Sequence, residues 1–379
     1  MGYLKIELPF WIKKPVLALG AHTKNTLCFV QNNLAHITQI HQNLNDPGDF
    51  LRFQKAVKGF LKRSPKIVAY DLHPEYQSTK YIRQLSAKSF DLSAVQHHHA
   101  HIASCMAENG LKNQKVIGVA FDGTGLGLDN TLWGAEFLIC DYKNFIRIGH
   151  LREIPLLGAE KAILEPWRIA ALWLYLIYRE NLLNLKLNFV KHIAKDKWQI
   201  LKKMYLSNFN APLASSMGRL FDAVASIVLL KFKARFEGDL AMELERMAFS
   251  SSGQQLISSK VKGYRFKIIR ENDTYIIEPL PVFKEIVLNL KAKDPKEEIA
   301  YRFHFTVAQM IDKMCLSLRR EFKIDKVALS GGVFQNRLLA NLSSGLLLKD
   351  GFKIFTHKRL PCNDASLSLG QAIIGGVKS

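Results

Sequence analysis

The chain has 379 residues, of which 48% are hydrophobic and 23% charged, so it can bury one large core or two lobes that share a cleft. Its formal net charge of +20 fits an anionic partner such as a nucleotide, but no basic run interleaved with aromatics indicates a nucleic-acid surface, which disfavours nucleic acid as a partner. No signal peptide or membrane span is visible. The five cysteines are scattered and lack CxxC spacing, which argues against a cysteine-based zinc finger. We therefore expect a cytoplasmic protein with reduced thiols and no membrane contact.

Strands joined by polar, glycine-containing turns recur along the chain. Residues 16–30 (VLALGAHTKNTLCFV) predict a strand, a turn and a second strand, and residues 66–74 (KIVAYDLHP) predict a buried strand that ends in a polar turn. Residues 116–138 repeat the first pattern around the sequence DGTG. KVALSGGVFQN, at residues 326–336, predicts a strand, two glycines and a helix that begins at Asn336.

The middle of the chain is mainly helical in its apolar spacing. Helices are predicted over residues 165–183, 217–230 and 301–322. Residues 266–277 predict a hairpin that turns at residues 271–273, and residues 249–255 (FSSSGQQ) predict a mobile surface loop.

The three glycine-bearing turns after strands indicate two α/β lobes that close over a ligand containing phosphate. Glycine lets the backbone approach phosphate closely, and successive N–H groups or a helix N-terminus supply positive potential there. A lone DGTG is also typical of a tight hairpin. None of the turns matches the Walker pattern or a Rossmann GxGxxG followed by an acidic strand end.

The stretch VQHHHAHIAS, residues 95–104, places four histidines within five positions. If residues 96–107 form a helix whose alanines face inward, His97 and His101 lie four residues apart on one face. This is the spacing with which two imidazoles hold one divalent metal ion. A surface helix with surplus histidines, or core histidines satisfied by hydrogen bonds, remains an alternative. His98 and His99 point elsewhere, and His99 could contact substrate or support the ligands.

Two histidines need anionic partners to hold such a metal. Asp122 follows an apolar strand and Asp364 precedes a predicted C-terminal helix, so both can face the cleft. Two imidazoles and two carboxylates suit Fe²⁺, Mn²⁺ or Zn²⁺. Alternatively, a neutral histidine oriented by Asp122 could act as a general base. The absence of GxSxG, and of a cysteine beside the histidines, disfavours a covalent hydrolase.

Taken together, the motifs resemble the C-terminal carbamoyltransferase domain of the HypF family. They occur in the expected order: DLHPEYQST, VQHHHAH, GVAFDGTGLGLDNTLWGAEFL, EPWR, SSMGRLFDAVAS, FEGDLAMELE and LSGGVFQNRLL, then ND and SLGQA. The resemblance implies an α/β, two-lobed actin/sugar kinase/Hsp70-like (ribonuclease H-like) fold with a helical insertion. Residues 1–112 would form a first lobe with the metal-binding helix. Residues 113–379 would form a second lobe, with a helical and hairpin insertion at about 155–300 and a C-terminal helix that returns to the first lobe.

The resemblance also implies roles for individual residues. Those matching the divalent metal site, with iron or zinc as the expected metal, are His97, His101, Asp122 and Asp364. Those expected at the reaction centre are His97, His101, Asp122, His99 and Lys24. Those expected to face carbamoyl-adenylate, AMP or ATP are Gly123, Thr124, Gly125, Asp222, Glu237, Gly238, Gly331, Gly332 and Asn336. Asn25, His73 and His304 match family motifs near the cleft without an assigned role.

In this family a carbamoyl group passes from carbamoyl-adenylate to the C-terminal cysteine of HypE and becomes a cyanide ligand in [NiFe]-hydrogenase. The HypF domains that make the adenylate lie N-terminal to the matching region, so a separate subunit is one expected source. Two other functions remain open, namely tRNA threonylcarbamoyl transfer and a nucleotide-binding scaffold that has lost catalysis. Three departures motivate the scaffold: Gly158-Ala159-Glu160 where GGD is usual, residues 237–241 (EGDLA) where EGQAA is usual, and Ala365-Ser366 where two glycines are usual.

Overall fold

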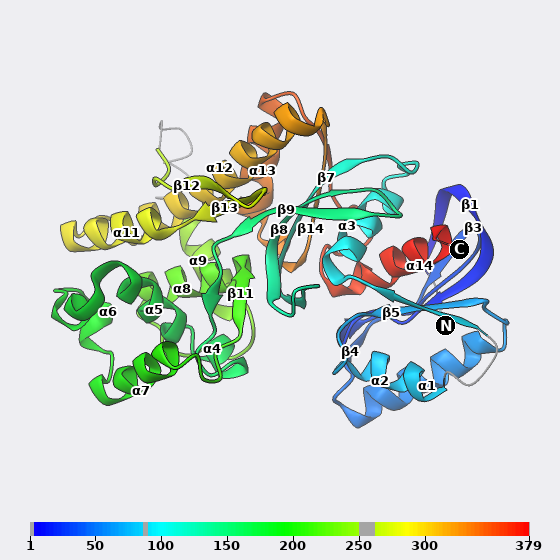
Figure 1. Cartoon of the computed structure of the whole chain (residues 1–379), viewed down its shortest axis with the longest axis horizontal. Helices are drawn as coiled ribbons and strands as arrows, with labels where there is room; N and C mark the ends of the chain where they lie inside the picture. Colours follow the sequence, from blue (N-terminus) through cyan, green and yellow to red (C-terminus); the bar gives the residue numbers. More distant parts are fainter. Residues whose placement is uncertain (1–3, 86–89, 250–261, 379) are drawn as a thin grey trace.

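The structure is a computed structural model that describes residues 4–85, 90–249 and 262–378. It contains a smaller sheet near both termini and a larger sheet that carries most of the helices (Figure 1). Helices α3 (His97–Glu108) and α14 (Leu367–Val377) lie between the two sheets. The two layers of α/β structure are thus joined through a helical pair.

The smaller sheet has the strand order β3-β1-β5-β6. Its strands are β1 (Leu4–Ala18), β3 (Cys28–Ile37), β5 (Ile67–Asp71) and β6 (Asp91–Val95). Alternate residues of β1 face opposite sides, as a strand requires. Leu17 packs in a cluster with α1 (Pro47–Leu61) and α2 (Gln77–Leu85), whereas Val16 and Ala18 pack in a cluster with α14. A short pair, β2 (Thr23–Asn25) and β4 (His41–Asn43), lies beside this sheet.

The larger sheet has the order β12-β13-β9-β8-β7-β14-β15; β11 also pairs with β8, and β10 pairs with β11. Its centre consists of the antiparallel strands β7 (Val116–Leu126), β8 (Leu132–Cys140) and β9 (Phe145–Leu151). The parallel strands β14 (Lys326–Ser330) and β15 (Lys353–Phe355) extend it on one side. The other strands are β10 (Ile154–Pro155), β11 (Leu213–Ser216), β12 (Lys267–Glu271) and β13 (Thr274–Glu278).

Helices cover the larger sheet and form the main apolar core with it. In chain order they are α4 (Glu160–Leu164), α5 (Trp167–Tyr178), η1 (Arg179–Asn184), α6 (Asn188–Lys191), α7 (Lys195–Leu206), α8 (Met217–Leu229), α9 (Asp239–Ala248), α11 (Leu280–Ala292), α12 (Lys296–Phe322), η2 (Gly332–Gln335) and α13 (Arg337–Lys349). Among the described residues, no helix has both the length and the apolar composition that a membrane span needs.

Helices α3 and α14 pack closely because Gly370 has no side chain. A Cβ atom on Gly370 would lie 1.8 Å from the backbone oxygen of Ala100. On its other side α3 packs on β7, where a Cβ on Gly118 would lie 2.7 Å from a carbon of Ile102. The histidine helix is therefore held on both sides.

Most predicted elements are confirmed, but α12 begins at Lys296 and not at residue 301, and two other elements differ. DGTG is not the turn of its hairpin, because β7 continues to Leu126 through an irregularity between Phe121 and Gly125, and the chain reverses at residues 127–131. In place of one helix over residues 165–183, α5 ends at Tyr178 and the short 3-10 helix η1 follows it. The helix ends there because Arg179 has a φ of 50°. The hairpin with its turn at residues 271–273 is confirmed. Of the loop predicted over residues 249–255, only Phe249 is among the described residues.

Candidate metal and nucleotide site

Helix α3 carries the histidine cluster. Gln96 caps its N-terminus, since the side chain of Gln96 accepts a hydrogen bond from the backbone N–H of His99 at 2.9 Å. His97 and His101 share one face, with ring centroids 5.0 Å apart. Both rings are buried. The alternative of a surface helix with surplus histidines therefore does not fit.

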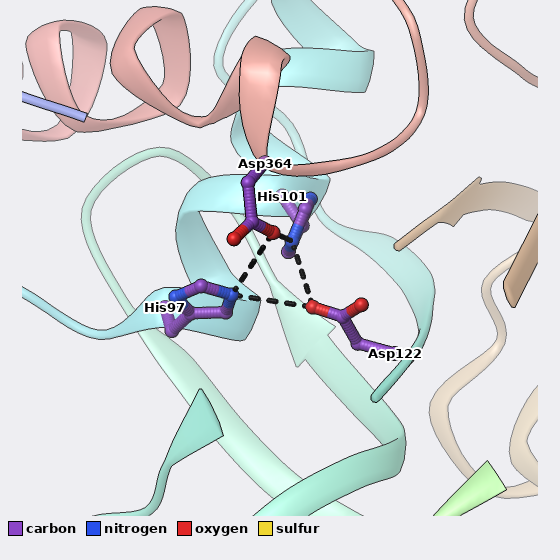
Figure 2. Close-up of side chains that lie close together, drawn as sticks. All are labelled: His97, His101, Asp122 and Asp364. Carbon is purple, nitrogen blue, oxygen red and sulfur yellow. Dashed lines mark hydrogen bonds and ion pairs between the residues drawn. The ribbon is translucent and has the colours of Figure 1, made fainter. Parts of the chain in front are cut away.

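Asp122, near the end of β7, and Asp364, at the start of η3 (Asp364–Ser366), face these rings (Figure 2). Oδ2 of Asp122 lies 3.2 Å from Nε2 of His97 and 3.2 Å from Nε2 of His101. Oδ1 of Asp364 lies 3.7 and 3.5 Å from the same two nitrogens. One ligand atom from each of the four residues lies within 4.8 Å of the others. This donor set fits a single divalent cation.

The charges of the cluster favour a cation. Burial alone lowers the pKa of His97, but Asp71, Asp122 and Asp364 outweigh it and raise that pKa well above its ordinary value. Burial alone raises the pKa of Asp364, yet the two imidazoles lower it to about 2. The imidazoles also hold the pKa of Asp122 well below its ordinary value, against the effect of burial. Both carboxylates are thus ionised at neutral pH, as metal ligands must be.

Asp71 contacts the ring nitrogen of His97 that does not face the cluster. The sequence analysis assigned no role to Asp71. Oδ2 of Asp71 lies 2.8 Å from Nδ1 of His97, and both groups are almost fully buried. Oδ1 of Asp71 accepts a hydrogen bond from the backbone N–H of His73 at 2.9 Å. Because Nδ1 of His97 donates to Asp71, Nε2 is left to face the cluster, as for many metal-bound histidines. The sequence signals were the position of Asp71 at the end of a buried strand and its place in the motif DLHPEYQST.

Glycines of two predicted loops surround Asp122. A Cβ atom on Gly125 would lie 2.7 Å from the ring of His98, and one on Gly123 would lie 2.0 Å from Oε1 of Glu237. Gly331 has a φ of 104°, and its Cβ would lie 2.1 Å from the backbone oxygen of Phe121. The N–H groups of Gly123 and Gly332 donate to Oδ1 of Asp122 at 2.9 and 3.1 Å. Thr124 lies between the first two glycines and is half-buried. These loops therefore bring backbone to within hydrogen-bonding distance of the Asp122 carboxylate.

A second charged group, formed by Arg219, Asp222 and Glu237, lies on the other side of Gly123. Nη2 of Arg219 lies 2.9 Å from Oδ2 of Asp222 and 3.1 Å from Oε1 of Glu237. Burial, together with Glu237, raises the pKa of Asp222 to about 6, although Arg219 lowers it. The Glu237 side chain is half exposed, and Gly238 adopts a left-handed conformation at the start of α9.

Arg219 is a second candidate site residue, and the sequence analysis did not assign it. Its side chain is 2% exposed, and within the described part of the chain its Nε and Nη1 atoms have no hydrogen-bond partner. Buried donors without partners are costly, so these two nitrogens are candidate hydrogen-bond donors to an anionic or hydroxyl-bearing ligand. The motif SSMGRLFDA contained Arg219, but only its acidic residue was assigned.

Asn336 and His304 are engaged with each other. Oδ1 of Asn336 caps α13 by accepting the N–H of Leu339 at 2.9 Å, and its Nδ2 lies 2.9 Å from Nε2 of His304. The other ring nitrogen of His304 lies 2.7 Å from the backbone oxygen of Ala300, and burial lowers the pKa of His304 to about 4. Asn336 thus has a structural role in this arrangement.

His99, expected to contact substrate or support the ligands, is directed away from the metal cluster. Nε2 of His99 lies 2.6 Å from the backbone oxygen of Asp141, and its ring packs against Phe145. Burial lowers the pKa of His99 to about 4. The reason is geometric: two residues along a helix rotate a side chain by more than half a turn, so His99 cannot share the face of His97 and His101.

Lys24 is an exposed residue of a short strand near the turn that carries Asp364. It belongs to β2, which contacts η3, the turn that begins with Asp364. Its φ of 47° is unusual for a residue with a side chain. Asn25, the next residue, is buried and donates from Nδ2 to the backbone oxygens of Leu19 and Ala21, each at 2.6 Å.

The three departures from the family pattern differ in their structural effect. Ala159 keeps a φ of 49°, a conformation that glycine adopts more readily. Asp239 is buried and forms an ion pair with Arg235 at 2.6 Å. Ser366 has an ordinary φ of −89°, and its hydroxyl donates to the backbone oxygen of Asn363 at 3.0 Å, so this change adds no backbone strain.

Comparisons with known proteins agree with this geometry. Residues 12–108 match the family model described as the HypF Kae1-like domain. Residues 118–371 match the model described as the second subdomain of the Kae1-like domain of carbamoyltransferase.

Curated relatives cover almost the whole chain. The carbamoyltransferase HypF of Synechocystis sp. is 33% identical over 97% of this chain and 48% of its own length. A carbamoyltransferase HypF homolog of Cupriavidus necator is 32% identical over 94% of this chain and 90% of its own length. The chain therefore spans about half the length of the HypF of Synechocystis but most of the shorter homolog.

Solved HypF structures share the fold. A crystal structure of full-length HypF in the phosphate- and nucleotide-bound form gives a TM-score of 0.89 at 37% identity, over 98% of this chain and 57% of that one. The HypF of T. kodakarensis gives a TM-score of 0.86 at 28% identity, over 99% of this chain and 48% of that one. The expected two-lobed α/β fold of the actin/sugar kinase/Hsp70 type is confirmed.

Proposed function

The chain belongs to the HypF carbamoyltransferase family, and on that premise we propose that it transfers a carbamoyl group from carbamoyl-adenylate to the C-terminal cysteine thiol of a HypE-like acceptor protein. One observation carries the proposal. Four ligand atoms, from His97, His101, Asp122 and Asp364, converge next to the glycine loops, and the partly unpaired Arg219 lies on the other side of Gly123.

A divalent cation, iron or zinc, is the cofactor that this donor set fits. His97 and His101 would bind it through Nε2, and Asp122 and Asp364 through one oxygen each. When bound, such a cation supplies positive charge that holds the nucleotide phosphate and polarises the carbamoyl carbonyl. Asp71 keeps the ring of His97 in the orientation that this binding requires.

The nucleotide would lie between the cluster and the group formed by Arg219, Asp222 and Glu237. A full-length HypF structure that this chain resembles was obtained with phosphate and nucleotide bound. The half-exposed Glu237 and the raised pKa of Asp222 suit hydrogen bonds with ribose hydroxyls, while the unpaired nitrogens of Arg219 suit an anionic group. The ribose and the phosphate of carbamoyl-adenylate or AMP account for both preferences.

The acceptor thiol would come from another protein. Burial raises the pKa of four cysteine thiols of this chain, Cys28, Cys105, Cys140 and Cys315. Burial and Asp122 also raise the pKa of Cys362, to about 12. A thiol must be ionised to attack a carbonyl carbon, so none of these groups is a good nucleophile at neutral pH. In the transfer, the acceptor sulfur bonds to the carbamoyl carbon, the bond to the phosphate oxygen breaks and AMP leaves.

A HypF-type adenylate-forming unit is the proposed source of carbamoyl-adenylate, and it could act as a separate subunit. The second candidate function is a nucleotide-binding scaffold without catalysis. The observation that favours the scaffold is the loop at Ala159, where a non-glycine residue is held at positive φ. The two functions differ in turnover and agree in nucleotide binding.

The direct test supplies synthetic carbamoyl-adenylate and a HypE-like acceptor to the purified chain loaded with Fe²⁺ or Zn²⁺. Intact-protein mass spectrometry of the acceptor should show the mass of one carbamoyl group. An acceptor in which serine replaces the terminal cysteine should remain unmodified. Asp122→Asn should reduce the rate by at least about 100-fold, because the variant loses an ionised ligand.

AMP binding, measured by calorimetry on the same preparation, separates the two candidates. Binding of AMP without modification of the acceptor would contradict carbamoyl transfer and favour the scaffold. Neither binding nor transfer would contradict both.

A further inference from the structure

Glu108, the last residue of α3, lies two turns beyond His101 on the same helix. Its Oε1 accepts hydrogen bonds from three consecutive backbone N–H groups, at 2.7 Å from Lys358, at 3.1 Å from Leu360, and from Arg359. Three successive N–H groups that converge on one carboxylate form an anion-binding nest. The end of α3 is therefore bound to residues 358–360.

His357 strengthens this contact and links it to a third element. Nδ1 of His357 lies 2.7 Å from Oε2 of Glu108, and Nε2 lies 2.8 Å from Oγ of Ser330. Hydrogen bonds from His357 and from backbone N–H groups lower the pKa of Glu108 although burial raises it, and burial lowers the pKa of His357. A neutral His357 thus donates a hydrogen bond from Nδ1 to the Glu108 carboxylate and accepts one at Nε2 from the Ser330 hydroxyl.

The order serine, histidine and glutamate also occurs in hydrolases, but Ser330 is fully buried at the end of β14 and offers no open face for substrate. The hydrogen bonds among Glu108, His357 and Ser330 are instead connected to the metal cluster through the residues that follow Ser330. Gly331, which follows Ser330, donates its N–H to the backbone oxygen of Cys362 at 2.9 Å, and Gly332 donates to Asp122. The carboxylate of Asp364 lies two residues after Cys362.

Asp364 thus lies between two attachments of its segment to α3. Before it, residues 357–360 are bound to Glu108; after it, the backbone oxygen of Ser366 accepts the hydroxyl of Ser104 at 2.8 Å. Three residues separate Leu360 from Asp364, a span of at most about 14 Å, so the attachment at Glu108 limits how far Asp364 can move from α3.

We propose that Glu108 and His357 are positioning residues of the metal site, which hold Asp364 in reach of the cation bound by His97 and His101. The inference rests on the proposed metal site. Neither residue belongs to the four ligands, and both side chains are buried, at 1% and 2% exposed. Supporting partners of metal ligands typically change metal affinity 10- to 100-fold when they are substituted.

The test measures Co²⁺ binding to the full chain, by titration against a competing chelator and by the visible absorption spectrum of the bound ion. We expect Glu108→Gln and His357→Gln each to weaken Co²⁺ binding about 10- to 100-fold and to change the spectrum, because Asp364 no longer holds its place. Asp49→Asn is the matched control. Asp49 is also a buried carboxylate that accepts a backbone N–H, from Asn43 at 3.0 Å, but it lies at α1, outside the site.

The control variant should lose thermal stability and keep wild-type Co²⁺ affinity and spectrum. If Glu108→Gln and His357→Gln behave like this control, the positioning role is contradicted. If Glu108→Gln does not fold, His357→Gln decides by the same two readouts, since it leaves the three backbone contacts of Glu108 intact. If the wild-type chain itself binds no Co²⁺, the proposed metal site fails and the inference fails with it.

Discussion

Both carboxylate oxygens of Asp71 accept hydrogen bonds, so replacing one of them should affect the metal site. Its two oxygens separately accept hydrogen bonds from the ring of His97 and from the backbone N–H of His73. In Asp71→Asn only one oxygen remains, so one of the two buried N–H groups loses its acceptor. We expect metal affinity to fall about 10- to 100-fold through misorientation of His97, measured by Co²⁺ titration of folded protein. Unchanged affinity would show that Asp71 does not orient His97.

Ala159 is held at a φ of 49° where glycine would be unstrained. Holding a residue with a side chain in such a conformation destabilises the folded state by about 1–3 kcal/mol. Glycine removes this strain, but it also makes the unfolded chain more flexible, which offsets part of the gain. Ala159→Gly should therefore raise the free energy of unfolding by about 1 kcal/mol, measured by urea denaturation. A destabilised variant would mean that the positive φ is not strained.

Among single residues, the sequence predicted those site residues whose position follows from local spacing along the chain. His97 and His101 could be paired because their separation is one helical turn. Asp122 and Asp364 were candidates because one follows a strand and the other precedes a helix, and both matched family positions. Asp71 and Arg219 could not be assigned, because their roles depend on contacts with residues far along the chain. The helical spacing already directed His99 away from the face of His97 and His101; its place at the reaction centre was implied by the family resemblance alone.

Among the elements, the contact between α3 and α14 sets the position of the histidine helix. A side chain at Gly370 would collide with the backbone of Ala100, whereas a Cβ at Gly345, inside α13, would meet nothing within 4 Å. We expect Gly370→Ala to lower the free energy of unfolding by about 1–3 kcal/mol or more. Gly345→Ala, the matched control, should raise it by about 0.5–1 kcal/mol. Equal effects in thermal or urea unfolding would contradict close packing of the two helices.

The turn before α9 should respond to acid. Hydrogen bonds from Arg235 lower the pKa of Asp239 to about 2. A depressed folded-state pKa stabilises the fold above the ordinary pKa of an aspartate, near 4, and this stabilisation is lost as the pH falls towards 2. The difference in unfolding free energy between wild type and Asp239→Asn should thus shrink between pH 6 and pH 3. A constant difference would show that the ion pair contributes nothing.

Elements were predicted well where period and capping agreed. Helix α8 and the start of α13 followed the expected bounds, since Ser216 and Asn336 cap them. The turn of β7 and β8 was misplaced because glycine and aspartate mark both turns and irregular strands. Here DGTG bends β7 so that Asp122 reaches α3, and the reversal follows at residues 127–131.

On the scale of the whole molecule, the cluster joins segments from both ends of the chain. The histidines lie on a helix between the two sheets, Asp122 on the larger sheet, and Asp364 at the turn before α14, which packs on the smaller sheet. Residue patterns predicted two lobes, but their arrangement came from the family resemblance, because no local pattern encodes a contact between such distant segments.

The central claim is that one cation lies between these four side chains. X-ray diffraction from crystals of the chain loaded with Zn²⁺, collected at the zinc absorption edge, locates the ion directly. We expect a single anomalous peak about 2.0–2.2 Å from Nε2 of His97, Nε2 of His101 and one oxygen each of Asp122 and Asp364. A peak elsewhere, or one that leaves either aspartate beyond coordinating distance, would contradict the account.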